Sequence, residues 1–324
     1  MRLMLFAFDC ETLPMRRPVA LLALICCCMA GVGRTAEPTL TDVRYGPHER
    51  NVLDFYKAAA NGPSPVLIFF HGGGFRGGDK GSVRQAADQY LHAGIAVVSA
   101  NYRLSQQAIY PAPMLDGARV VQFVRSKAKD WNINASQVAV SGGSAGGTMA
   151  LWIALHDDLA EQAGPDPVAR ISTRVSCASV KNAPSSMDPE FILKYVGSTN
   201  FGAMLALHGA RTLEEYRTPK LRKQALDASP IEHATPDDPP LFLWYGGALT
   251  PTPLPGDTPF SGWIHHPRFG ELLKEKYDKL GLECHFLPRG KPAAQDAEIE
   301  FLRKCFRSKP ASAGPANTTG SRNP

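Results

Sequence analysis

The chain has 324 residues and 44% hydrophobic residues, which is enough for one large α/β domain or two small ones. Its formal net charge is +5, but no basic stripe interleaved with aromatic residues is present, which argues against nucleic-acid binding. The cysteines outside the first 36 residues, Cys177, Cys284 and Cys305, are scattered, which argues against a disulfide scaffold or a zinc site. Cys177 and Cys284 lie in apolar strand-like runs and are expected to be buried thiols.

The N-terminus has the layout of a secretory signal peptide. Arg16 and Arg17 precede an apolar run over residues 19–32, and small residues close that run. The run is shorter than a membrane span requires. We therefore expect a signal peptide over residues 1–36, with Met15 as an alternative start, and an exported protein that is periplasmic or secreted. The alternative is a protein anchored in the membrane by an uncleaved N-terminal segment.

Strand-like and helix-like segments alternate along the rest of the chain. Strands are expected over residues 51–57, 65–70, 95–100, 137–140, 175–180, 240–245 and 282–287, and helices over 82–93, 115–128, 145–155, 268–280 and 293–306. This alternation predicts an α/β domain over residues 37–308, with a mostly parallel central sheet and helices on both faces. Residues 309–324 are rich in Pro, Ala, Ser, Gly and Asn and are expected to form a disordered tail.

The strongest motif is Ser141-Gly-Gly-Ser144-Ala-Gly-Gly147, which contains G-x-S-x-G between a predicted strand and a predicted helix. A nucleophile on such a turn needs small neighbours, because the turn is strained and the backbone approaches closely. Its hydroxyl then lies near a helix N-terminus, which favours developing negative charge. Ser144 is the expected nucleophile; the alternative is a glycine-rich turn that only tightens strand-to-helix packing.

A second motif, His71-Gly-Gly-Gly-Phe75, directly follows the strand predicted over residues 65–70. Glycines there expose backbone N–H groups to an oxyanion, and acyl transfer needs such donors together with the N–H of the residue after the nucleophile. The expected oxyanion hole is Gly73, Gly74 and Ala145. A phosphate cradle is disfavoured because no G-x-x-x-x-G-K-[ST] pattern is present.

Together with Asn101-Tyr-Arg-Leu104, these motifs resemble the α/β-hydrolase superfamily. The sequence is most similar to bacterial esterases and lipases with an HGGG oxyanion loop, near the hormone-sensitive-lipase-like and feruloyl-esterase-like branches. The resemblance covers roughly residues 43–306. It implies an α/β-hydrolase fold, serine-dependent hydrolysis of carboxylic esters, and a small insertion over the site at about residues 188–222.

The second half departs from the family pattern. The acid is expected just after the strand at 240–245, but residues 246–250 contain no carboxylate, and the nearest one is Asp257. The base is expected after the last strand, but residues 288–292 contain no histidine. His265 or His266, which lie in the loop after the acid strand, are the candidate bases, and Asp257 is the candidate acid.

Two hypotheses follow. The first is a carboxylic-ester hydrolase that forms an acyl-enzyme on Ser144 and acts on a small-molecule or polysaccharide-borne ester. The second is a binding protein that keeps the fold but lacks a working Asp/His pair. No cofactor and no metal are expected, because no histidines and carboxylates cluster in sequence; His156, His208 and His233 are expected at the surface or in the insertion.

Overall fold

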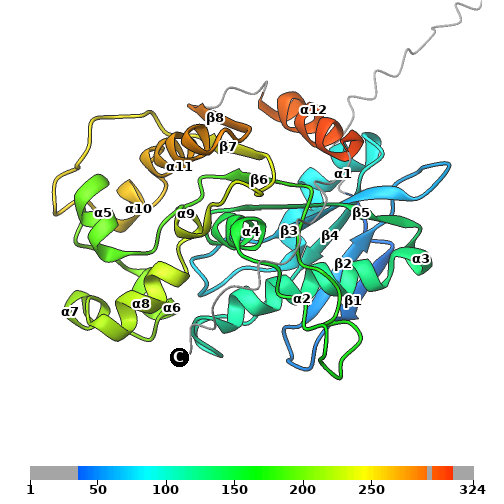
Figure 1. Ribbon diagram of the computed structural model, residues 1–324, viewed down its shortest axis with the longest axis horizontal. Helices are drawn as coiled ribbons and strands as arrows, with labels where there is room; N and C mark the ends of the chain where they lie inside the picture. The colour runs from blue at the N-terminus through cyan, green and yellow to red at the C-terminus, as the bar shows by residue number, and fades with distance from the viewer. Residues whose placement is uncertain (1–35, 290–293, 309–324) are drawn as a thin grey trace, which may run out of the picture. The chain divides into compact units, whose positions relative to one another are not determined.

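A single twisted sheet organises the molecule in the computed structural model, which describes residues 36–289 and 294–308 (Figure 1). The sheet has eight strands in the order β1-β2-β4-β3-β5-β6-β7-β8. β1 and β2 pair antiparallel with their neighbours, and the strands from β4 to β8 run parallel. The strands are β1 (Leu40–Arg44), β2 (Val52–Tyr56), β3 (Ser64–Phe70), β4 (Ala96–Ala100), β5 (Ile133–Gly143), β6 (Cys177–Lys181), β7 (Leu241–Tyr245) and β8 (Cys284–Pro288).

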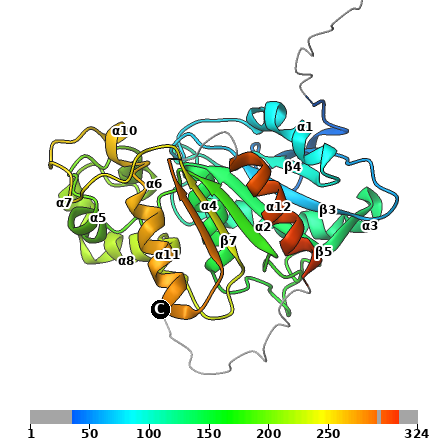
Figure 2. The same ribbon diagram turned by 90° about the horizontal axis from the view of Figure 1, so that it is seen from above.

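Helices cover both faces of this sheet, as the sequence pattern predicts (Figure 2). The larger helices are α1 (Arg84–His92), α2 (Ala112–Ser126), α4 (Ala145–Leu155), α11 (Arg268–Leu280) and α12 (Ala294–Arg307). α1 and α12 pack on one face, where Leu67 and Phe242 meet Phe301 and Leu302. α2, α4 and α11 pack on the other face. Each fully buried aliphatic or aromatic side chain in these layers stabilises the fold by about 1.5–3 kcal/mol.

α4 is the most buried helix of the second layer. Each of its residues from Ala145 to Leu155 is buried, in agreement with its almost entirely apolar and small composition. A helix that is apolar all round belongs in the interior, where it contacts the sheet on one side and other helices on the rest. α4 accordingly packs against β5, β6, α2 and the short helix α9 (Pro230–His233).

Short helices form a separate layer at one end of the sheet, visible at the left of Figure 1. They are α5 (Pro189–Tyr195), α6 (Ala203–Leu207), α7 (Leu213–Tyr216), α8 (Pro219–Asp227) and α10 (Phe260–Trp263). The first four occupy the segment expected to be the insertion. α10 lies in the loop between β7 and α11, so two chain segments that are distant in sequence build this layer together (Figure 2).

Several elements differ from the sequence-based expectation, which did not include the short helices α5 to α10. β1 and the short helix α3 (Ala128–Trp131) were not predicted, and β5 begins at Ile133 rather than at residue 137. β1 is mostly exposed and pairs only with β2, so it lacks the apolar run that marks a buried strand. The start of β5, which includes Asn134 and Ser136, is polar and therefore also lacks the apolar run by which a strand is predicted.

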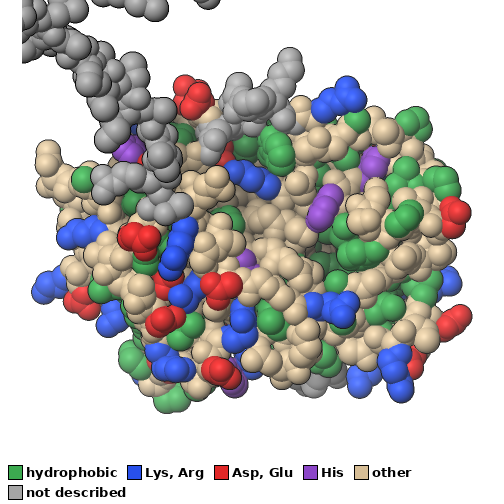
Figure 3. Space-filling view, turned by 180° about the vertical axis from the view of Figure 1, so that it is seen from behind, with side chains coloured by type: hydrophobic (Ala, Val, Ile, Leu, Met, Phe, Trp, Pro, Cys, Tyr) green, Lys and Arg blue, Asp and Glu red, His purple; other side chains and the backbone are tan. Residues whose placement is uncertain are grey.

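The surface carries charges of both signs. On the face seen in Figure 3, Lys and Arg side chains are interspersed with Asp and Glu rather than gathered in one stripe. Within the described ranges, no helix has the length and apolar character needed to cross a membrane. The predicted signal peptide and the predicted C-terminal tail lie outside the described residues.

Candidate active site

The glycine motifs lie side by side because the register of the sheet brings them together. In the parallel pair β3–β5, Phe70 is paired with Gly142, so both strands end at the same edge. The loop that begins at His71 and the turn at Ser144 therefore meet beyond the carboxyl ends of adjacent strands. This edge is where open parallel sheets bind their ligands.

Ser144 occupies the strained turn that its motif predicts. Its backbone has φ 53° and ψ −123°, a conformation that non-glycine residues rarely adopt and that costs about 1–3 kcal/mol. The turn is held by two hydrogen bonds, from the Ser144 N–H to the Lys181 carbonyl and from the Thr148 N–H to the Ser144 carbonyl, each 2.9 Å long. The side chain is presented directly before α4, whose N-terminal dipole favours negative charge.

Close packing explains why the neighbours of Ser144 are glycines. A Cβ on Gly146 would lie 2.1 Å from the Phe70 carbonyl oxygen, and a Cβ on Gly142 would lie 2.5 Å from the backbone of Gly146. On the facing loop, a Cβ on Gly72 would lie 2.9 Å from the Gly143 carbonyl oxygen. The two glycine-rich segments thus touch backbone to backbone, which fixes the position of the Ser144 hydroxyl relative to the facing loop.

An imidazole reaches the serine from the β7–α11 connection. His265 Nε2 lies 2.8 Å from Ser144 Oγ, within hydrogen-bond distance. Partial burial lowers the pKa of His265 below its usual value, which keeps the ring neutral and able to accept a proton near pH 7. The pair has the geometry expected of a nucleophile and its general base.

His266 lies next to His265 but points away from the serine. Its Nε2 is 2.8 Å from Thr250 Oγ1, and its Nδ1 accepts the backbone N–H of Arg268 at 3.1 Å. On the other side of His265, the buried Trp263 donates its indole N–H to the Asn200 carbonyl. Both neighbours of the His265 segment are therefore anchored, and the imidazole that contacts Ser144 is supported by a fixed backbone.

The backbone N–H groups predicted to bind an oxyanion border the same cavity. Gly73 and Gly74 have φ values of +112° and +62°, which turn this loop into a conformation that favours glycine. Among the described residues, no acceptor is hydrogen-bonded to the N–H of Gly73 or Gly74. Ala145 is the first residue of α4, where N–H groups have no partner within the helix.

Asp257, the predicted acid, is not joined to either histidine. It is exposed, and within the described part of the chain its carboxylate makes no side-chain hydrogen bond or ion pair. The place after β7 that usually holds the acid is occupied by glycines, and the Gly246 N–H donates to Asn182 Oδ1 there. Among the described residues, no carboxylate is hydrogen-bonded to His265. The observed arrangement is a Ser–His pair rather than a three-residue set.

The cavity over Ser144 measures about 680 Å³. Ser144, Ala145, Gly73, Gly74 and His265 line one part of it. Apolar side chains from residues 187–207 and 260–264 line much of the rest, namely Met187, Ala203, Met204, Leu207, Phe260 and Ile264. No sequence pattern marks these pocket residues, because they lie on or beside short helices whose packing is decided by tertiary contacts.

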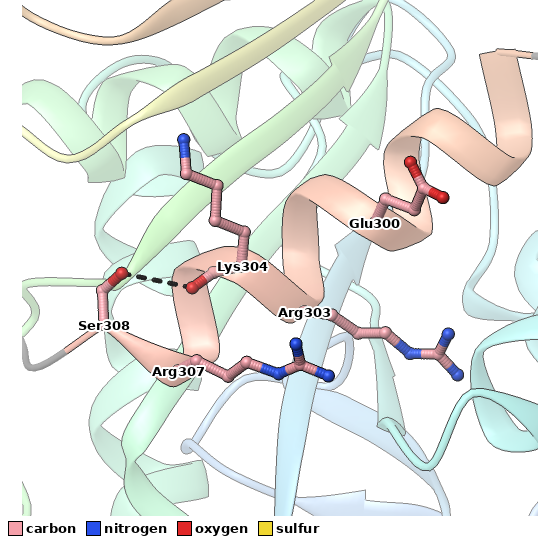
Figure 4. A pocket seen from close by; sticks show the side chains of 5 residues that line it. All are labelled: Glu300, Arg303, Lys304, Arg307 and Ser308. Atoms are coloured by element: carbon pink, nitrogen blue, oxygen red, sulfur yellow. Dashed lines mark hydrogen bonds between the residues drawn. The ribbon is translucent and has the colours of Figure 1, made fainter.

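A second hollow, of about 460 Å³, lies along α12. Figure 4 shows Arg303 and Arg307 extending from α12 in the same direction, while the Ser308 hydroxyl donates to the Lys304 carbonyl. Glu300 also lines this hollow. It contains neither a serine–histidine pair nor a turned glycine loop, so it is not a candidate for ester hydrolysis.

Polar residues that follow β3 and β4 make structural contacts beside the oxyanion loop. Arg103 and Asp116 form a bidentate ion pair, with guanidinium-to-carboxylate distances of 2.7 and 2.8 Å. His71 is buried against the ring of Tyr102, and the Tyr102 hydroxyl donates to the His71 carbonyl. Burial lowers the pKa of His71, in agreement with a neutral, structural role beneath the oxyanion loop.

Comparison with known proteins places this geometry in a family. The BD-FAE family model matches residues 53–250, which include both glycine motifs. The chain belongs to the BD-FAE family. Among curated proteins it is similar to the probable carboxylic ester hydrolase LipM of Mycobacterium tuberculosis, with 26% identity over 63% of this chain and 47% of LipM. Esterase LipI of the same organism is 39% identical over 28% of this chain and 29% of LipI.

Solved structures give the same fold. A truncated carbohydrate esterase from gut microbiota has a TM-score of 0.66 at 20% identity, covering 85% of this chain and 98% of that one. An acetyl ester-xyloside bifunctional hydrolase from Caldicellulosiruptor lactoaceticus has a TM-score of 0.60 at 23% identity, covering 86% and 97%. This BD-FAE member thus has the α/β-hydrolase fold predicted from its motifs. The matched region spans about half the length of LipM.

Proposed function

We propose that this chain is a serine-dependent carboxylic-ester hydrolase in which Ser144 is the nucleophile and His265 the general base. The observation that carries the proposal is the 2.8 Å contact between Ser144 Oγ and His265 Nε2 on a strained strand-to-helix turn. The esterase names of the relatives support the reaction class. Nothing in those names favours the alternative, a binding protein without a working acid–base pair.

The proposed reaction has two halves. In the first, His265 Nε2 takes the Ser144 hydroxyl proton as Oγ attacks the acyl carbon, and the N–H groups of Gly73, Gly74 and Ala145 hold the resulting oxyanion. The imidazolium then gives its proton to the alkoxide oxygen, the alcohol leaves, and the acyl group stays on Oγ. In the second half, His265 takes a proton from water, the hydroxide attacks the acyl carbon, and the carboxylic acid leaves as Ser144 regains its proton.

The absence of a carboxylate on His265, within the described residues, has a kinetic consequence. In the Ser-His-Asp arrangement the acid orients the imidazole and stabilises its charged form, and its loss lowers kcat by as much as about 10⁴-fold. Here the anchored neighbours Trp263 and His266 supply the orientation but no compensating charge. We therefore expect a working but modest hydrolase.

The cavity favours esters with a small apolar acyl group. Methionine, leucine and phenylalanine side chains line most of its wall, and methionine adapts to irregular ligand shapes. Arg76 and Gln106 stand at the same cavity and supply hydrogen-bond donors for a polar alcohol portion. A small-molecule ester or an acyl group on a polysaccharide fits this combination, and the carbohydrate esterase among the structural neighbours supports the second.

The first test is hydrolysis of p-nitrophenyl acetate and butyrate by wild type and Ser144→Ala, with His92→Ala as a matched control. His92 is an exposed histidine on α1 that is paired with Asp88. We expect loss of turnover in Ser144→Ala and no change in His92→Ala. A folded wild-type protein that hydrolyses the esters no faster than Ser144→Ala would contradict the hydrolase proposal and favour the binding-protein alternative. Labelling with a fluorophosphonate, followed by peptide mass spectrometry, identifies the reacting hydroxyl.

Export is part of the same proposal. It is supported by the sequence of residues 1–36, where a basic patch precedes a short apolar run and small residues. Fractionation of cells that express the full chain tests it: an exported protein appears in the periplasm or medium with a shortened N-terminus. Full-length chain confined to the membrane fraction would instead support the uncleaved anchor.

A further inference from the structure

Two histidines and an aspartate meet at the far end of α4 from Ser144. His156 follows the last residue of α4, Asp227 is the last residue of α8, and His233 is the last residue of α9. One ligand atom from each of the three lies within 4.8 Å of the others. α4 rises about 1.5 Å per residue, so its 11 residues separate this cluster from Ser144 by roughly 16 Å.

Each imidazole of the cluster is hydrogen-bonded through one ring nitrogen to a backbone carbonyl. His156 Nδ1 lies 3.0 Å from the Asp157 carbonyl, and His233 Nε2 lies 2.6 Å from the Asp227 carbonyl. A carbonyl oxygen only accepts, so these ring nitrogens carry the hydrogen atoms. The lone pairs therefore remain on His156 Nε2 and His233 Nδ1. Metal-binding histidines commonly donate their second ring nitrogen to a backbone carbonyl in this way.

The electrostatics of the cluster favour a cation. The two rings lie 4.7 Å apart between centroids, so one cation can contact both imidazoles. The C-termini of α4 and α8 both end here, and the helix dipole places negative charge at such ends. The Tyr110 hydroxyl donates to Asp227 Oδ2, which orients the carboxylate and leaves Oδ1 available.

We propose that His156, Asp227 and His233 bind a divalent transition-metal ion of the zinc class, at a site separate from the Ser144 cavity. Two imidazoles and one carboxylate form the ligand set that zinc prefers over calcium or magnesium, and water completes the tetrahedron. The ion joins the end of α4 to α8 and α9. Its role is to tie the insertion, which supplies part of the pocket wall, to the buried helix that begins at Ser144.

The test is a titration of the full chain, free of any affinity tag, with ZnCl₂ by calorimetry. We expect one zinc ion per chain in wild type and at least about tenfold weaker binding in His156→Gln and in His233→Gln. The matched control is His92→Gln, which removes an exposed histidine beside a carboxylate elsewhere and should bind as wild type does. The buried Cys177, Cys284 and Cys305 do not compete at the surface.

Two further readouts keep the test independent of enzyme activity. At a zinc concentration 100-fold above the Kd, Tm should rise by about 5 °C in wild type and not in either histidine variant. Cu²⁺ should quench the emission of Trp152, whose ring centroid is 4.3 Å from that of His156, in wild type but not in His156→Gln. Absence of saturable zinc binding, or equal binding by wild type and both variants when each is folded by circular dichroism, would overturn the proposal. Neither outcome depends on ester hydrolysis.

Discussion

Replacing His265 with alanine removes the imidazole that contacts Ser144 and leaves the oxyanion loop and the strand-to-helix turn at Ser144 untouched. A positioned general base contributes about 10²–10⁴-fold to a reaction of this kind. Because no described carboxylate is hydrogen-bonded to the imidazolium that forms, we take the lower end of that range. The expected fall in kcat/KM is about 100-fold, which corresponds to about 2.7 kcal/mol of transition-state stabilisation.

The adjacent histidine is the informative comparison. His266→Ala removes the contact with Thr250 and the acceptor of the Arg268 N–H, and each such hydrogen bond contributes about 1 kcal/mol to stability. We expect His266→Ala to lower the free energy of unfolding by about 2 kcal/mol and kcat/KM by less than about tenfold. Urea unfolding followed by circular dichroism and p-nitrophenyl butyrate kinetics measure the two effects in the same preparations.

An exchange of behaviour between the two variants would contradict His265 as the base. A His265→Ala protein that keeps more than a third of the wild-type kcat/KM is incompatible with His265 as the base. A His266→Ala protein that is folded and stable but loses activity 100-fold would make His266 the base after a rearrangement of the loop. His92→Ala, on α1, controls for the loss of an exposed imidazole.

Three other results are expected. kcat/KM should fall as the pH is lowered through an apparent pKa below about 6.5, because burial lowers the pKa of His265 and the protonated ring cannot accept the serine proton. A midpoint above pH 7 in a pH-rate profile would contradict this. Gly146→Ala should destabilise the protein by about 2–4 kcal/mol in urea unfolding, since the new Cβ lies 2.1 Å from the Phe70 carbonyl oxygen, and unchanged stability would refute the close approach. Asp257→Asn should change kcat less than twofold in the ester assay, since its carboxylate has no described partner, and a large loss would restore it as the acid.

The strand-to-helix turn at Ser144 and the oxyanion loop were predictable from the sequence, because each is determined by residues that are neighbours in the chain. Glycines around Ser144 and after residue 70 are required by backbone approach, and the apolar runs of β3 and β5 fix where those loops emerge. The boundaries of α4 and α11 agree with the sequence pattern for a related reason, since α4 is apolar throughout and Gly281 ends α11 in a left-handed conformation.

The proposed base and the cluster of His156, Asp227 and His233 could not be predicted from the sequence, because both depend on tertiary contacts. His265 and His266 are adjacent and chemically identical, and they differ in their contacts: His266 is hydrogen-bonded to Thr250 and to the Arg268 N–H, whereas His265 contacts Ser144. His156 and His233, expected at the surface or in the insertion, are brought together by the packing of α4 against α9. No spacing rule for metal ligands covers residues so far apart in the chain.

The position of His265 before α11 has a practical consequence for protein engineering. Every group in the proposed mechanism lies between Gly73 and His265, so under that proposal β8 and α12 serve to extend the sheet and to cover one face. The exposed Gly281, around which an added Cβ would meet nothing within 4 Å, separates the two parts. A chain divided at Gly281 would give two fragments. The first would be inactive until the second, which carries β8 and α12, binds to it and completes the fold. Hydrolysis that returns on mixing the fragments would report their association, whereas full activity of the first fragment alone would show that the scaffold is dispensable.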